Sequence, residues 1–131
     1  MSITIDQSEL EGRAAQLVEA AKKAGADACD AVAITGVSLS VDVRDGKVEE
    51  TDRAEGDDVT LRVFVGKRTA SVSANVLDDP QALADKAVAM AKVTPEDPYA
   101  GLADASRLLT DIPELEILDD TEMDAAGLAD R

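Results

Sequence analysis

The chain has 131 residues, enough for one compact domain or for one domain with an extended tail. It has no histidine, one cysteine and no long apolar run, which excludes a His-based catalytic pair, an internal disulfide and a membrane span. A formal net charge of -15 disfavours direct binding to nucleic acid or to an anionic membrane.

The first predicted element is a helix over residues 7–24. Asp6 lies three residues before Glu9, the spacing of a capping box, and Gly25 supplies a left-handed stop. Apolar residues recur between them at helical spacing and form one stripe: Leu10, Ala14, Leu17, Val18 and Ala21.

Strands are predicted next. A short apolar run at 31–34 precedes a strand over 37–43, in which apolar and polar residues alternate. Asp45-Gly46 predicts a hairpin turn, since both central positions of such a turn favour a positive φ. The return strand, 47–54, is polar and is expected at a sheet edge or facing solvent.

Two further strands complete the predicted sheet. Gly56-Asp57-Asp58 is expected to break the chain before a strand over 59–65. Gly66-Lys67 then turns the chain into a strand over 70–76. The four strands are predicted to form an antiparallel meander with one apolar face.

A second helix is expected to cover that face. Asp79 is a natural N-cap, Pro80 suits the first helical position, and Pro95 ends the helix before Thr94. The elements predict an α+β fold: an antiparallel or mixed sheet of four to five strands with two helices packed on one face, in the order α-β-β-β-β-α.

The charge pattern divides the chain near residue 94. Residues 1–93 carry 17 acidic and 11 basic side chains, whereas residues 94–131 carry 11 acidic and two basic ones. We interpret 1–93 as the α+β domain and 94–131 as an acidic extended segment leading to a truncated helix. The apolar pattern that begins near Ala125 stops at Arg131, so we expect the chain to be part of a longer polypeptide.

No catalytic or metal-binding residue is predicted in this chain. Gly36-Val37-Ser38-Leu39-Ser40 lacks the last glycine of a nucleophile elbow, and Gly66-Lys67-Arg68 lacks the earlier glycine of a phosphate loop. The carboxylates around 42–52 alternate between strand faces, so they suit a solvated edge better than a cation site. Cys29 lies beside Asp30, whose negative charge disfavours a reactive thiolate.

Charged residues on the strands have two interpretations. Cross-strand ion pairs are the simpler one, and a surface that docks a partner or a peptide is the other. The candidates for docking are Arg44, Lys47, Glu49, Arg62, Lys67 and Arg68.

Three segments, in this order, resemble the PmbA/TldD family. Val43–Glu50 (VRDGKVEE) and Val59–Ser71 (VTLRVFVGKRTAS) are similar to successive blocks of its N-terminal domain. Thr94–Leu102 (TPEDPYAGL) is the most specific segment and resembles PmbA, also called TldE, more than TldD. The similarity covers about residues 8–120.

The resemblance implies a role in a cytoplasmic metalloprotease system of bacteria or archaea, in a family also named for modulation of DNA gyrase. In that system TldD carries a zinc site on an HExxxH motif, and PmbA pairs with TldD and lacks that motif. No family catalytic or metal residue corresponds to a position of this chain. The resemblance therefore implies an accessory subunit with no cofactor in residues 1–131, and with zinc in the catalytic partner or parent complex. An HExxxH motif beyond these residues would instead make the parent protein catalytic itself.

We accordingly expect the chain to serve in assembly or in shaping a substrate chamber. Its expected partners are a TldD-like subunit or a second copy, together with a peptide substrate, and neither nucleic acid nor membrane. The alternative is a non-enzymatic acidic regulator that imitates the charge of DNA and acts on gyrase.

Overall fold

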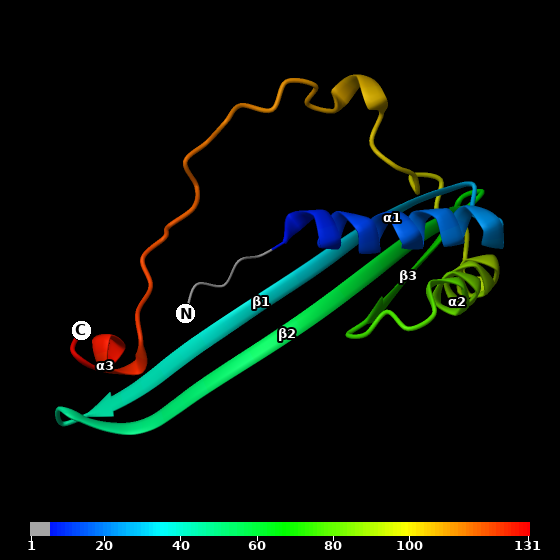
Figure 1. Cartoon of the computed structure of the whole chain (residues 1–131). Coiled ribbons are helices and arrows are strands. Elements are labelled where there is room, and N and C mark those ends of the chain that lie inside the picture. Colours follow the sequence, from blue (N-terminus) through cyan, green and yellow to red (C-terminus); the bar gives the residue numbers. More distant parts are fainter. Residues whose placement is uncertain (1–5) are drawn as a thin grey trace. The chain divides into compact units, whose positions relative to one another are not determined.

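A computed structural model describes residues 6–131 of the chain (Figure 1). The elements are α1 (Gln7–Ala24), β1 (Ala28–Arg44), β2 (Lys47–Val65), β3 (Arg68–Ala74), α2 (Pro80–Val93), a 3-10 turn η1 (Ala105–Arg107) and α3 (Ala125–Ala129). They belong to two compact units. Residues 6–35 and 57–108 form one, which we call the helix-covered unit, and residues 36–56 and 109–131 belong to the other.

Helix α1 spans the predicted residues. The Asp6 side chain accepts a hydrogen bond from the Ser8 N–H at 3.0 Å, which satisfies one of the free amides of the first turn. Glu9 forms an ion pair with Arg13, so its carboxylate serves a different contact from the one a capping box predicts. Gly25 ends the helix at a φ of 99°, a conformation that glycine adopts without steric cost.

The sheet has three strands in the order β1-β2-β3 (Figure 1). The turn between β1 and β2 has φ values of 51° at Asp45 and 73° at Gly46, as a two-residue hairpin loop requires. Strand β2 then pairs antiparallel with β3, with Leu61 opposite Val72 and Val63 opposite Ala70. Both predicted hairpin turns are confirmed.

Helix α2 also begins and ends as predicted. The Asp79 carboxylate accepts a hydrogen bond from the Ala82 N–H at 3.0 Å, and Pro80 occupies the first turn. Thr94 caps the other end, one residue before Pro95.

The core of the helix-covered unit lies between the two helices and one face of the sheet. Helix α2 packs against both α1 and β3. Alternate residues of β2 and β3 point into the core, since successive side chains of a strand face opposite ways. The buried core residues are Leu17, Ala20, Ala21, Val59, Leu61, Val63, Ala70, Val72, Ala84, Ala87, Val88 and Ala91.

The expected four to five strands and the order α-β-β-β-β-α are wrong, although the α+β class is confirmed. Gly56-Asp57-Asp58 does not break the chain, because these residues lie inside the continuous strand β2. Gly56 has no positive φ, and the Asp57 carboxylate is held by contacts to Thr35 and Arg13. The run at 31–34 likewise continues into β1, and the observed order is α-β-β-β-α, followed by η1 and α3.

None of the helices within residues 6–131 has the length and apolar character of a membrane span.

Candidate docking surface

The part of the β1–β2 hairpin formed by residues 36–56, which we call the ribbon, consists of two strands and their turn. Its β1 residues alternate strictly between apolar and polar side chains. Val37 and Val43 are 38% and 45% exposed, and Val48 on β2 is 53% exposed. The four apolar residues on one face of β1 are termed the stripe: Val37, Leu39, Val41 and Val43.

The ribbon lacks the third strand that often supports a strand pair. An isolated two-stranded hairpin is marginally stable in water, and three strands or a covering helix are the usual remedy. Strand β3 pairs with β2 only from Val59 to Val65, so the ribbon has no third strand among the described residues. An exposed stripe on such an element is typical of a surface that another molecule or domain covers.

Three of the predicted docking residues lie on the ribbon. Arg44 and Glu49 form an ion pair across the turn at 3.4 Å, with 75% and 51% of their side chains exposed. Lys47 begins β2 beside them and is exposed. Because all three side chains are exposed, a partner can reach them. The Arg44–Glu49 ion pair adds little to the stability of the fold at this exposure, so a partner could replace it at small cost.

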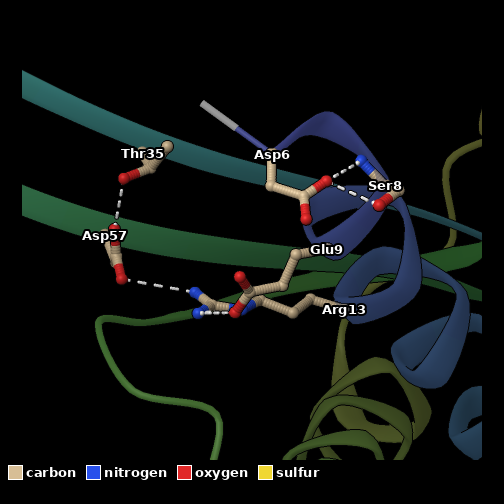
Figure 2. Close-up of polar contacts among 6 residues, drawn as sticks. All are labelled: Asp6, Ser8, Glu9, Arg13, Thr35 and Asp57. Atoms are coloured by element: carbon tan, nitrogen blue, oxygen red, sulfur yellow. Dashed lines mark hydrogen bonds and ion pairs between the residues drawn. The ribbon is translucent and has the colours of Figure 1, made fainter. Parts of the chain in front are cut away.

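A polar network fixes the end of the helix-covered unit from which the ribbon continues (Figure 2). The Thr35 hydroxyl donates to Asp57 Oδ1 at 2.6 Å, and Arg13 Nη1 donates to Asp57 Oδ2 at 3.3 Å. Arg13 Nη2 also donates to Glu9 Oε1 at 2.7 Å. Asp57, on β2, thus contacts α1 through Arg13 and β1 through Thr35.

We predict that Asp57→Asn destabilises the chain more at neutral pH than in acid. The hydrogen bond from Thr35 and then that from Arg13 hold the pKa of Asp57 below its ordinary value. A lowered folded-state pKa stabilises the fold above the unfolded-state pKa, and this contribution is lost as the pH falls through the folded-state value. Thermal unfolding should show a gap in Tm between the two proteins at pH 7 that closes below about pH 4. A gap of constant size would show that the Asp57 charge has no such role.

Arg62 is engaged within the helix-covered unit. Its Nε donates to Asp30 Oδ1 at 2.9 Å, Nη2 donates to the other carboxylate oxygen, and the guanidinium lies 5.3 Å from the centroid of the Phe64 ring. The hydrogen bond to Asp30 raises the pKa of Arg62. This cross-strand pair fits the simpler interpretation, in which Arg62 holds β1 against β2.

Lys67 and Arg68 fasten the segment that follows α2. Arg68 Nη1 donates to the Thr94 carbonyl and Nε forms an ion pair with Glu96 at 3.8 Å. Lys67 Nζ donates to the Ala100 carbonyl at 3.3 Å, and the Lys67 carbonyl accepts from the Asp97 N–H at 2.8 Å. The structure therefore places both side chains against residues 94–100. Their polar groups form hydrogen bonds and an ion pair within the chain, in place of the contacts to a partner that were predicted.

Cys29 is half-buried, with its Sγ 3.8 Å from the Val18 carbonyl oxygen. Burial is the main cause that raises the pKa of its thiol, with Asp30 contributing less. A raised pKa leaves little thiolate at neutral pH, which suits a packing role.

Within residues 6–131, no three side chains of the His, Cys, Asp or Glu type converge on a point where they could hold a metal ion. The abundant carboxylates are spread along strands and turns, and the chain has no histidine. The described residues therefore do not fit a resident zinc ion, which usually takes three or four nitrogen, sulfur or oxygen ligands.

Residues 29–91 match the family model of PmbA/TldA metallopeptidase domain 1. The chain belongs to the PmbA/TldD family. A Haemophilus influenzae protein named Metalloprotease PmbA homolog is 32% identical over 121 residues, which cover 90% of this chain and 26% of that protein. The chain thus spans about a quarter of the length of this curated relative.

A crystal structure from Bacteroides thetaiotaomicron, of a protein named as a proposed modulator of DNA gyrase, has the same fold. The TM-score is 0.78 at 21% identity, over 90% of this chain and 27% of that one. At this identity the likeness concerns the fold alone.

Two features of the surface are not anticipated from the sequence. The network of Thr35, Asp57 and Arg13 links residues far apart in the chain, and Asp57 follows a glycine in what resembles a turn. The second feature is the exposure of the stripe. The alternation of apolar and polar residues in 37–43 predicts a strand whose apolar side is buried, whereas the structure leaves that side partly exposed.

Proposed function

We propose that this chain is an assembly domain of a PmbA-like subunit in a cytoplasmic TldD/PmbA-type metalloprotease complex that processes peptides. The observation that carries the proposal is the ribbon, which has no third strand among the described residues and whose apolar stripe remains partly exposed, with Val37 and Val43 at 38% and 45%. Membership of the family supplies the context, since its matched domain is named for metallopeptidases. The partner is a TldD-like subunit or a second copy of the chain.

Zinc in this proposal belongs to the catalytic partner or to the parent complex. A zinc ion there would polarise a peptide carbonyl and activate water. The residues of this chain contribute by binding and positioning, because those described do not provide a ligand set for zinc.

The experiment that tests assembly replaces residues 37–54 with a short Asn-Gly turn. We expect the helix-covered unit to fold, since its core residues all lie outside 36–56. Sedimentation of the chain alone, and mixed with a TldD-like family member, should show a complex for the native chain and none for the shortened one. Equal complex formation by both chains, or by neither, would refute the assembly role.

A second candidate function is a non-enzymatic acidic regulator of DNA gyrase. It is favoured by the 28 acidic residues against 13 basic ones, and by the name of the structural neighbour. Against it, the ribbon carries both signs of charge, and acidity also serves solubility. Salt-sensitive inhibition of gyrase supercoiling by the chain would favour this candidate over assembly.

A further inference from the structure

Strand β2 has a free backbone edge along the ribbon. Its pairing with β3 begins at Val59, so on that side residues 47–56 have no neighbouring strand among those described. None of the turn and loop hydrogen bonds between backbone groups involves these residues, and all of their side chains are exposed. Unpaired N–H and C=O groups in such a row are a template for an added strand.

The turn geometry indicates which amides point outward. The two residues that flank a two-residue loop, Arg44 and Lys47, form a hydrogen-bonded pair. Amides alternate in direction along a strand, so the N–H groups of Val48, Glu50 and Asp52 face away from β1. An added strand of about seven residues would reach all three.

The charges beside this edge select the occupant. Residues 47–56 carry four acidic and two basic side chains. Glu49 and Glu55 are paired with Arg44 and Arg53, whereas Glu50 and Asp52 form no hydrogen bond or ion pair among the described residues. Glu50 and Asp52 lie on the same face of β2, two residues apart. Opposite charges directly across a strand pair are favourable, and like charges are not.

We infer that the free edge of β2, at residues 48–54, binds an extended basic peptide as an added strand. Lysine or arginine at alternate positions of the peptide lies across from Glu50 and Asp52. This inference rests on the peptide-processing part of the proposed function and gives it a substrate class. Backbone hydrogen bonds provide tolerance of sequence, and the two carboxylates provide preference for positive charge.

The test is a titration of the isotope-labelled chain with a seven-residue peptide that alternates threonine with lysine, followed by amide NMR shifts. We expect saturable shifts at residues 48–54. A peptide with glutamate in place of lysine should bind about tenfold more weakly, since two attractive pairs become repulsive. A lysine peptide N-methylated at alternate residues should not bind, because it keeps the charge and loses the ladder hydrogen bonds.

The double variant Glu50→Lys and Asp52→Lys should weaken binding of the lysine peptide about tenfold. Asp111→Lys with Glu114→Lys is the matched control, since it changes the net charge equally in the exposed segment after η1. Equal binding of the N-methylated peptide, equal loss in the control, or shifts confined to residues outside 48–54 would overturn the inference. Glu50 and Asp52 lie across from Val41 and Leu39 of the stripe, so this double variant is not used to judge assembly. Sedimentation of the native and shortened chains reports on assembly, and titration of the native chain with the three peptides reports on peptide binding.

Discussion

Leu39→Lys combined with Val41→Lys should abolish complex formation at concentrations where the native chain is fully bound. Both residues belong to the stripe and are only half-exposed, so a partner that covers the ribbon would contact them at its centre. Two lysines there remove apolar contacts and place charges that a partner must desolvate, which we expect to weaken binding at least about a hundredfold. Sedimentation of the mixture with a TldD-like family member measures this loss.

The matched control is Ser38→Lys combined with Ser40→Lys. These residues lie on the same strand but on its opposite face, and the change in net charge is identical. We expect the control to change binding less than about threefold, because charges outside the centre of an interface contribute little. Equal losses from both pairs would show that the strand as a whole, or its charge, matters and that the stripe does not.

Local signals in the sequence predict much of this fold. The caps Asp6 and Asp79 and the turn at Asp45-Gly46 act through neighbouring backbone groups, so their effects can be read without knowing the tertiary structure. The break predicted at Gly56-Asp57-Asp58, which lies inside strand β2, could not be judged from local signals in this way. Gly56 can turn a chain or extend it, and contacts from Arg13 and Thr35 to the next residue accompany the extended form.

The candidate docking residues show the same distinction between local and distant determinants. Arg62, Lys67 and Arg68 are cations on or beside strands, as Arg44 and Lys47 are, and the sequence does not separate the two groups. Asp30 and the carbonyls of Thr94 and Ala100 are the partners of the first group, and they come from segments 26 to 33 residues away. Only the structure shows that the first group is committed to internal contacts.

Leu61→Ala should cause a severe loss of stability. Leu61 is 0% exposed and lies on the central strand opposite Val72, facing the helices. Removing three carbons from a packed interior loses their transfer free energy and leaves a cavity, which costs about 2–5 kcal/mol. That is a large fraction of the roughly 5–15 kcal/mol that stabilises a domain.

The chain has few means of compensating for this loss. Within residues 6–131 the core is built from small side chains, with five alanines from the helices, and its largest fully buried side chains are Leu17, Leu61 and Val63. Packed alanines have no rotamers with which to fill a cavity, so the upper part of the range is expected. Leu118→Ala is the control, because Leu118 is 87% exposed and its loss should change the unfolding free energy by less than about 0.5 kcal/mol. Denaturant unfolding of both variants measures the difference, and equal stabilities would contradict the core assigned to Leu61.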